Sequence, residues 1–134
     1  MALRLSIVTP TRPLVDAVVE QVVAPGSEGE FGVLPGHAAL LAALKPGVVR
    51  WTESGKARRA AIAGGFAEVT QERVTVLAPA AELAEQIDPA EAQRRLADAS
   101  SALSNIGSLA PPEQVEQLRD AVERAQARID ALRA

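Results

Sequence analysis

The hydrophobic pattern of this 134-residue chain changes its period once, at Asp88-Pro89. Before this point, short apolar runs alternate with polar residues and are separated by turn-forming residues, which is typical of β-strands. After it, apolar residues recur at spacings of three and four, which places them on one face of a helix. One stretch of chain cannot follow both periods, so the sequence predicts an all-β module at 1–86 and a helical module at 87–134.

The first module is expected to form an antiparallel β-sandwich. Leu3, Leu5 and Ile7 alternate with polar residues, as the residues of a half-buried strand do. The β-branched run Val18–Val23 predicts a second strand that ends at Pro25-Gly26. Many short strands joined by tight turns favour a sandwich or a barrel. The remaining strands are expected at Val48–Thr52, Arg58–Ala63, Phe66–Thr70 and Arg73–Leu77, with hairpin turns at 53–56 and 71–72.

The second module is expected to form an antiparallel two-helix hairpin. In Asp88-Pro89 the aspartate suits the N-cap of the first helix and the proline its first helical position. This helix is expected to continue to Ser104, and a second helix to begin at Pro111-Pro112. Asp120 and Arg124 can form an ion pair one turn apart on the second helix. The apolar residues of the second helix follow the a and d positions of a heptad: Val115, Leu118, Val122, Ala125, Ile129 and Leu132.

The hairpin has few large apolar side chains, and several of its seam residues are alanine. Ordering one residue costs on the order of 1.5 kcal/mol, whereas burying one apolar side chain contributes about 1–2 kcal/mol. We therefore expect the hairpin to be weakly stable by itself and to settle on the sandwich or on a partner. A module of this kind is suited to more than one docked position.

The residue composition excludes several kinds of site. Cysteine is absent, so disulfides, thiol catalysis and zinc–thiolate sites are not available. The single His37 cannot form a multi-histidine metal site, so no metal is expected. Gly64-Gly65 lacks the motif of a phosphate-binding loop and is expected to mark a bulge or a close approach of strands.

Charge and hydropathy limit the partners of the chain. The net charge is −3, and neither module is basic: residues 1–85 carry 8 Lys and Arg against 9 Asp and Glu, and residues 86–134 carry 6 against 8. Nucleic-acid binding depends on a basic surface, so no nucleic-acid partner is expected. No apolar run approaches the ~18–20 residues that cross a bilayer, and Met1–Ser6 lacks a signal pattern. A soluble protein without direct membrane insertion is expected.

The stretch Gly29–Gly47 is rich in residues that change the direction of the backbone. Pro35-Gly36 and Pro46-Gly47 are each expected to form a turn, because proline fixes φ and glycine tolerates positive φ. The apolar segment between them is long enough for one buried strand. The stretch is expected to present Glu30 and His37 from one rigid loop.

Four blocks of the first module together resemble the epsilon subunit of the F-type rotary ATP synthase. They are Ser27–Ala38, Leu40–Arg50, Gly64–Val69 and Val74–Ala78, with the sequences SEGEFGVLPGHA, LLAALKPGVVR, GGFAEV and VTVLA. These blocks are spread over residues 27–78 of the first module, which makes the resemblance specific. The family's two-part build, a sandwich followed by a helical hairpin, agrees with the two modules predicted from the hydrophobic pattern.

The resemblance implies a non-catalytic subunit of the central rotor stalk of a proton-translocating ATP synthase. The sandwich would clamp the gamma subunit and the c-ring and pass torque between them. The hairpin would act as a mobile brake on ATP hydrolysis, extending from the sandwich to the catalytic alpha and beta subunits. The resemblance further implies a peripheral position in the F1 sector, on the cytoplasmic face of the bacterial plasma membrane.

The resemblance also assigns interface roles within the Gly29–Gly47 stretch. It implies that Glu30, Pro35, Gly36 and His37 contact the c-ring or the gamma subunit. From the residues alone, Glu30 can equally be a solvated acid, and His37 can be a loop residue that hydrogen-bonds a backbone group. A catalytic role for His37 is disfavoured, because the chain has no Tyr or Cys and no recognisable Ser/His/Asp set.

The segment Ile87–Ala92 resembles an Ile-Asp-x-x-Arg-Ala motif that binds ATP in some bacterial relatives. Ile87, Asp88 and Ala92 match the motif, but Glu91 stands at the arginine position and would repel phosphate. No cofactor is therefore required, and any ATP bound here would be regulatory. Asp88 can instead be a plain N-cap. The arginines available to replace the motif arginine are Arg94, Arg95, Arg119, Arg124 and Arg128.

Arg124 and Arg128 have a second candidate role. They lie one turn apart and away from the apolar seam, and the resemblance implies that they contact acidic loops of the alpha and beta subunits. A solvated helix face is the alternative.

Another class of function also fits the sequence: a free-standing nucleotide sensor, in which the hairpin closes over a small ligand. Such a sensor needs no partner, so co-elution of the purified chain with the gamma subunit separates the two functions. An enzyme is the third class and the least supported one.

Overall fold

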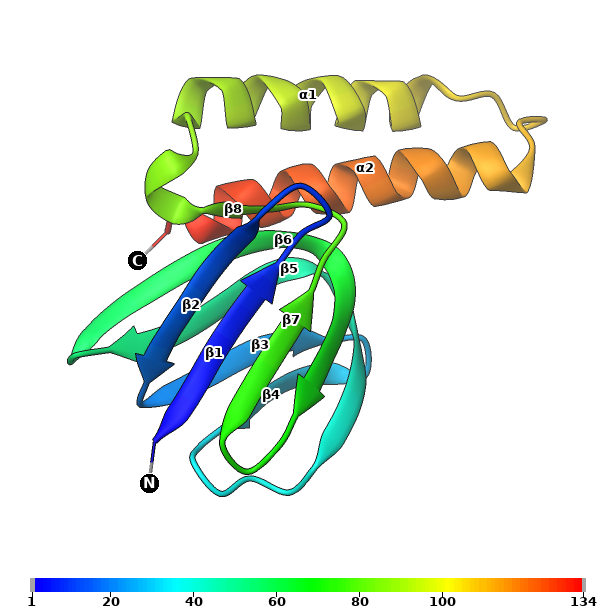
Figure 1. The fold of residues 1–134 in the computed structure, drawn as a ribbon. Helices are drawn as coiled ribbons and strands as arrows, with labels where there is room; N and C mark the ends of the chain where they lie inside the picture. Colours follow the sequence, from blue (N-terminus) through cyan, green and yellow to red (C-terminus); the bar gives the residue numbers. More distant parts are fainter. Residues whose placement is uncertain (1, 134) are drawn as a thin grey trace.

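The computed structural model describes residues 2–133 and shows a sheet of eight strands followed by two helices (Figure 1). The sheet folds over on itself into a sandwich, and the two antiparallel helices lie across one end of it. The predicted fold class, an antiparallel β-sandwich followed by a two-helix hairpin, is confirmed. The division into modules at 86/87 stays a prediction, and its outer bounds, Met1 and Ala134, lie outside the described residues.

The strands are almost all antiparallel to their neighbours. In chain order the elements are β1 (Leu3–Val8), β2 (Pro13–Val19), β3 (Gln21–Gly26), β4 (Gly29–Val33), β5 (Leu40–Glu53), β6 (Lys56–Val69), β7 (Arg73–Leu77), β8 (Ala81–Leu83), the 3-10 turn η1 (Ala84–Gln86), α1 (Pro89–Asn105) and α2 (Pro112–Ala131). Their order in the sheet is β2-β1-β7-β6-β5-β3-β4, and β8 also pairs with β6. The exception to the antiparallel arrangement is the parallel pair β1–β7.

Two stretches of strand are divided differently from the prediction. Val18–Val23 is not one strand, because Glu20 separates β2 from β3. β2 pairs with β1, whereas β3 pairs with β4 and β5, so the chain changes its partner strands at Glu20. β-Branched residues favour any strand, and the run itself carries no sign of this change. Conversely, the strands expected at Arg58–Ala63 and Phe66–Thr70 form parts of the single strand β6.

Pro46-Gly47 does not form the expected turn and lies inside β5. Pro46 is opposite Ala63 of β6, whose N–H donates to the carbonyl oxygen of Ala80 at 2.9 Å and so points away from β5. On the other side of β5, the pairing with β3 is interrupted between Val23 and Gly26. Proline is tolerated in a strand where its missing N–H breaks no ladder. The environment of Pro46 on both sides meets this condition.

The strand residues near Pro46 also differ in burial from the prediction. Leu40 and Leu41 begin β5 as expected, but Leu41 is 72% exposed. Gly64-Gly65 of β6 marks a close approach of strands and not a bulge, since the β5–β6 register continues unchanged on both sides. A Cβ atom at Gly65 would overlap the carbonyl oxygen of Leu77, and the φ of 128° there also favours glycine.

The buried apolar residues form two separate clusters. The larger cluster fills the interior of the sandwich with aliphatic side chains such as Leu5 and Val49 and with the buried Trp51. The smaller cluster lies between the hairpin and the sandwich and consists of Val48, Ala61, Ile87, Ala92, Ala127, Ile129 and Ala131. The hairpin therefore docks through a cluster of its own and contributes nothing to the interior of the sandwich.

The buried face of α2 is wider than the predicted seam. Its buried residues are Ala125, Ala127, Ile129 and Ala131, of which Ala127 and Ala131 fall outside the heptad. The reason is that α2 contacts α1 on one side and β5 and β6 on another. The local predictions for the helices are confirmed: Asp88 caps α1, and Arg124 pairs with Asp120 at 2.7 Å.

The two glycines Gly65 and Gly29 provide a matched test of the close approach at Gly65. They share similar φ values of 128° and 134°, so substitution by alanine adds a backbone strain of about 1–3 kcal/mol at either position. Nothing lies within 4 Å of a Cβ at Gly29, whereas a Cβ at Gly65 meets backbone. In urea unfolding followed by Trp51 fluorescence, we expect Gly65→Ala to lower the free energy of unfolding by about 1–3 kcal/mol more than Gly29→Ala. Equal losses would contradict the close approach.

Candidate functional site

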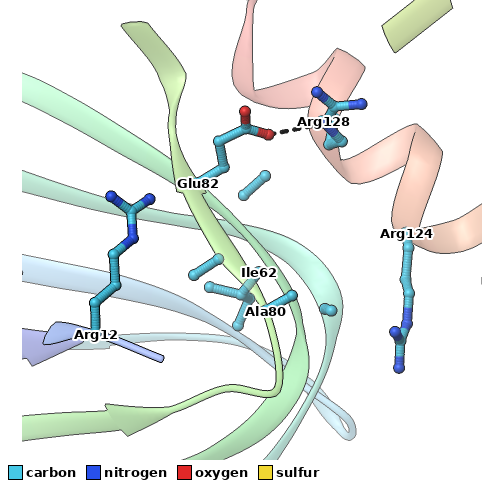
Figure 2. A pocket seen from close by; sticks show the side chains of 9 residues that line it. Arg12, Ile62, Ala80, Glu82, Arg124 and Arg128 are labelled. Atoms are coloured by element: carbon cyan, nitrogen blue, oxygen red, sulfur yellow. Dashed lines mark hydrogen bonds and ion pairs between the residues drawn. The ribbon is translucent and has the colours of Figure 1, made fainter. Parts of the chain in front are cut away.

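Arg128 of α2 lies at the centre of the contact between the hairpin and the sandwich. Its Nε donates to Glu82 Oε1 of β8 at 2.9 Å, as Figure 2 shows, and its Nη2 donates to Glu91 Oε1 of α1 at 2.8 Å. The Arg128 side chain is only 20% exposed. One guanidinium thus connects α2 to the sandwich and to α1.

Two open hollows flank Arg128. The first has a volume of about 360 Å³, and Figure 2 shows Arg12 on its sandwich side and Arg124 on its α2 side. The second, of about 490 Å³, lies between the helices and adds Glu91 and Arg95 to its lining. Both hollows contain cations and acids side by side, so neither presents a purely basic surface to a ligand.

The first turn of α1 places Glu91 opposite Arg128. Asp88 Oδ1 accepts hydrogen bonds from the backbone N–H groups of Ala90 and Glu91, at 3.0 and 3.4 Å, and so fixes where the helix begins. Near this N-terminus the helix dipole favours a negative charge. The hydrogen bond from Arg128 holds the pKa of Glu91 below its ordinary value, helped by the charges of Arg128 and Arg95. Glu91 is therefore ionised at neutral pH.

Further polar contacts tie the ends of the hairpin to β6. Arg59 Nε donates to the carbonyl oxygen of Ala131 at 2.7 Å, which satisfies a free carbonyl at the C-terminus of α2. Arg58 Nη2 donates to Glu85 Oε1 of η1 at 2.6 Å, and the Arg58 guanidinium lies 5.6 Å from the centre of the Trp51 ring. Two neighbouring arginines of one strand thus hold both the entry to the hairpin and its end.

The residues predicted to bind nucleotide are only partly brought together. Ile87 and Ala92 are buried in the smaller apolar cluster, and Asp88 serves as the N-cap. Arg95, Arg124 and Arg128 do line the hollows, and Arg124 is 47% exposed. Arg94 and Arg119 are exposed and lie outside both linings; Arg119 contacts Glu116 at 3.4 Å.

Sequence reasoning missed two residues of this site, Arg12 and Glu82. Arg12 lies in the turn between β1 and β2, and Glu82 lies in the short strand β8. No motif marks either residue, and only the packing of the hairpin on the sandwich brings them to Arg128. The one signal in the sequence is that each is a charged residue without an oppositely charged neighbour along the chain. This signal is too common to single out Arg12 and Glu82.

The residues predicted for an interface lie on two different elements, and not on one loop. Pro35-Gly36 forms the expected turn, in which the His37 N–H donates to the Leu34 carbonyl at 3.1 Å and Gly36 has a φ of 87°. The Gly36 N–H donates to the Gln71 carbonyl oxygen at 2.8 Å, which braces this turn against the turn between β6 and β7. The His37 Nδ1 lies 2.7 Å from the Ala38 carbonyl oxygen, so this nitrogen donates the hydrogen bond.

Glu30, the other predicted interface residue, lies on strand β4. Its carboxylate is 3.6 Å from the guanidinium of Arg50, and both side chains are exposed. It lines a surface hollow together with Asp130 and Arg133 of the helical module. The common-loop prediction was wrong because Gly29–Val33 pairs with β3, which a reading of glycines and prolines alone does not reveal.

An exposed apolar surface covers the outer side of β5, β6 and β7. Phe66 is paired with Leu77 across the β6–β7 ladder and with Ala43 across β5, and Leu41 lies two residues further along on the same side. Phe66, Leu77 and Leu41 are all exposed, and Phe66 and Leu77 line a hollow of about 490 Å³ whose walls are mainly apolar. Contiguous exposed apolar side chains can mark a protein–protein contact. We call this set (Leu41, Ala43, Phe66 and Leu77) the apolar outer face.

Residues 2–133 contain neither a cluster of candidate metal ligands nor a helix suited to spanning a bilayer. Within this range, no group of three or more His, Asp or Glu is placed to hold a metal ion. No helix in the described part of the chain combines the length and the hydropathy needed to cross a bilayer.

Comparison with known proteins gives a consistent result. Residues 2–84 match the family described as ATP synthase, Delta/Epsilon chain, beta-sandwich domain. The chain is 40% identical over 130 residues to the ATP synthase epsilon chain of Granulibacter bethesdensis, which covers 96% of both chains. It is 38% identical over 135 residues to the epsilon chain of a Synechococcus species, covering 100% of this chain and 99% of that one.

Solved structures show the same fold. A chain of the Euglena gracilis mitochondrial ATP synthase, in an assembly of OSCP, F1 and c-ring, matches with a TM-score of 0.81 and 25% identity, over 98% of this chain and 82% of that one. A chain of the Tetrahymena thermophila central stalk and c-ring matches with a TM-score of 0.67 at 13% identity, over 99% and 98% of the two chains. The second match concerns the fold alone.

The contact between Arg59 and the end of α2 can be tested by hydrogen exchange. Arg59→Met keeps the apolar stem and removes the donor to Ala131, which should weaken the last turn of α2 by about 0.3–1 kcal/mol. We expect faster exchange of the amides of this turn than in the wild-type chain. The control is Arg94→Met, which changes an exposed arginine of α1 for which the described residues contain no ion pair. Equal exchange in both variants would show that Arg59 does not hold the helix end.

Proposed function

The chain belongs to the family of ATP synthase epsilon chains, and we propose that it couples the gamma subunit to the c-ring and restrains ATP hydrolysis through its helical hairpin. It does so as a subunit of the central stalk without a catalytic site of its own. The observation that carries the proposal is the separation of the two apolar clusters. The sandwich keeps its interior whether the hairpin is docked or not, so one module can hold the rotor parts while the other moves.

Two surfaces of the sandwich suit two different partners. The apolar outer face is the surface for gamma, because burying Phe66, Leu77 and Leu41 supplies the hydrophobic contact that a stable subunit interface needs. The braced turn with Pro35, Gly36 and His37 lies at the end of the sandwich opposite the helices (Figure 1) and is the contact to the c-ring. Glu30, on β4, adds a charged contact at the side of the sandwich.

The hairpin is built to leave the sandwich. Most of its buried residues are alanines. Among the described residues, α1 makes extensive contacts with α2 but with no strand, so α1 is held mainly through α2. Undocking therefore exposes little apolar surface, and two states of this kind can be biased by a modest change in contacts. In the extended state Arg124 and Arg128 face acidic loops of the alpha and beta subunits. Arg128 becomes available only on opening, because Glu82 and Glu91 engage it in the docked state.

In this role the chain is a peripheral part of the F1 sector. Its place is the cytoplasmic face of the bacterial plasma membrane, where it reaches the membrane through the c-ring. The proposal needs no cofactor.

A free-standing nucleotide sensor is the weaker proposal. Arg95 and Arg124 would be available to phosphate, but Arg128 already has two carboxylate partners. Regulatory ATP would have to displace at least one of them. A free-standing sensor also gives the apolar outer face no partner. This function would be favoured only if the chain failed to co-elute with gamma.

The brake can be tested by removing or undocking the hairpin. Deleting residues 88–134 should leave assembly intact and raise ATP hydrolysis by the reconstituted catalytic sector. Ile129→Asp should also raise ATP hydrolysis, because the docked hairpin would bury an unpaired carboxylate at a cost of roughly several kcal/mol. Leu109→Asp is the matched control, because Leu109 is 97% exposed. The measurement is the hydrolysis rate against subunit concentration for the full-length chain, the deletion and the two point variants. If the four curves coincide, the hairpin is not a brake.

The gamma contact can be tested on the apolar outer face. Phe66→Asp should lower the affinity for gamma at least tenfold, because loss of a central interface residue costs about 2 kcal/mol of binding free energy. The loss is measured as reduced co-elution with gamma. Leu34→Asp introduces the same charge at an exposed leucine beside the Pro35 turn and should leave gamma binding unchanged. A loss of gamma binding with Leu34→Asp but not with Phe66→Asp would reverse the assignment of the two surfaces.

A further inference from the structure

We propose that Glu91 and Glu82 act as internal counter-ions that close the hairpin around Arg128 without a bound ligand. This inference rests on the proposed function, in which the position of the hairpin sets the brake. It adds that the resting position is decided by two carboxylates of the chain itself. It also predicts that the hairpin opens in two separable ways, one for each carboxylate.

The two carboxylates come from different elements and act on different contacts. Glu82 belongs to β8, so its bond to Arg128 ties α2 to the sandwich. Glu91 belongs to α1, so its bond ties α1 to α2. Loss of Glu82 should therefore release the hairpin from the sandwich as a unit, and loss of Glu91 should release α1 from α2.

The surroundings make these ion pairs stronger than the exposed ion pairs of the structure. The Arg128 side chain is 20% exposed, and those of Glu82 and Glu91 are 32% and 36% exposed. Surface pairs such as Arg119–Glu116 are far more exposed and contribute little. Charges partly removed from water are screened less by salt, and hydrogen bonds between ionised groups are among the stronger ones.

The alanine-rich docking contact increases the effect of these ion pairs. Of the seven residues in the smaller apolar cluster, four are alanines: Ala61, Ala92, Ala127 and Ala131. Each buries little apolar area, so the hydrophobic contribution to docking is small. A polar contact of ordinary strength can then decide whether the hairpin is closed.

The charges facing Arg128 balance without an added anion. Glu82 and Glu91 neutralise Arg128 and leave one negative charge, and Arg124 and Arg95 add two positive charges from α2 and α1. Arg12 of the β1–β2 turn adds a third across the first hollow, and Asp88 and Asp120, on the helices of Arg95 and Arg124, bring the sum to zero. Arg128 therefore has its hydrogen-bond acceptors in the chain, and an external anion would have to compete with them.

The absence of cysteine makes the inference directly measurable by spin labelling. One labelled pair, Asp98→Cys with Glu68→Cys, reports the distance from α1 to the sandwich. A second pair, Asp98→Cys with Gln117→Cys, reports the distance between α1 and α2. Distance distributions are recorded on the full chain at neutral pH, without nucleotide and then with Mg·ATP or pyrophosphate, and Trp51 fluorescence verifies that the sandwich is folded.

We expect the unaltered background to be closed without any ligand. Glu91→Gln should reduce the closed-to-open ratio of the α1–α2 pair by about three- to tenfold, as expected for loss of a partly buried charged hydrogen bond. Glu82→Gln should do the same for the α1–sandwich pair and leave the α1–α2 pair closed. The matched control is Glu123→Gln, an exposed acid of α2 for which the described residues contain no ion pair; it should change neither distribution.

Three results would overturn the inference. The first is a background that is open until Mg·ATP or pyrophosphate is added, since closure would then depend on an external anion. The second is a closed-to-open ratio in Glu91→Gln and Glu82→Gln equal to that of Glu123→Gln. The third is an identical response of both labelled pairs to both substitutions.

ATP hydrolysis by the reconstituted complex separates this inference from the proposed function. If Glu91→Gln opens the hairpin but neither it nor deletion of 88–134 changes hydrolysis, the internal counter-ions stand and the brake fails. If the deletion raises hydrolysis while the Gln variants stay closed, the brake stands and the internal counter-ions fail.

Discussion

The close contact between α2 and the sandwich, made through alanine side chains, determines the behaviour of the whole helical module. Ala127 and Ala131 face β5 and β6, where Ala61 completes the contact. Small side chains let a helix approach a sheet closely, but they remove little apolar area from water. The helix is therefore well positioned and weakly held. Its orientation brings Arg128 within reach of acids on two other elements.

Polar groups consequently carry a larger share of the docking than is usual in a protein interior. Arg128 joins three elements, Arg59 holds the Ala131 carbonyl at the end of α2, and Arg58 holds η1 through Glu85. Such contacts are directional, and those that join α2 to the sandwich are lost together when the helix moves away. Hydrophobic contacts, by contrast, weaken gradually with area. A docked state held in this way responds to single charged groups, which suits a module whose position is regulated.

The sandwich has the opposite character. Its interior is a continuous aliphatic cluster around Trp51, and the close approach at Gly65 fixes the long strand β6 against β7. The braced Pro35 turn and the apolar outer face both belong to this rigid part. In the proposed function, movement of the hairpin therefore leaves the contacts to gamma and to the c-ring in place. The same division would let the two proposed roles, coupling and restraint of hydrolysis, coexist in 134 residues.

The sequence by itself determined the features that depend on neighbours along the chain. The change of period at Asp88-Pro89, the Asp88 cap, the Asp120–Arg124 pair and the Pro35-Gly36 turn are local, and all are present. The signature blocks also identified the family, because they preserve residue identities and not only a pattern of polarity.

Tertiary structure alone decided the features that depend on which strands and helices meet. Pro46-Gly47 stays in a strand because its neighbours leave its N–H position unpaired, and Glu30 is separated from His37 because β4 pairs with β3. Ala127 and Ala131 are buried because α2 has a second contact face, towards the sheet. Arg12 and Glu82 join Arg128 from distant positions in the chain. Periodicity and turn signals describe a residue's own element, whereas these contacts are set by the register and packing between elements.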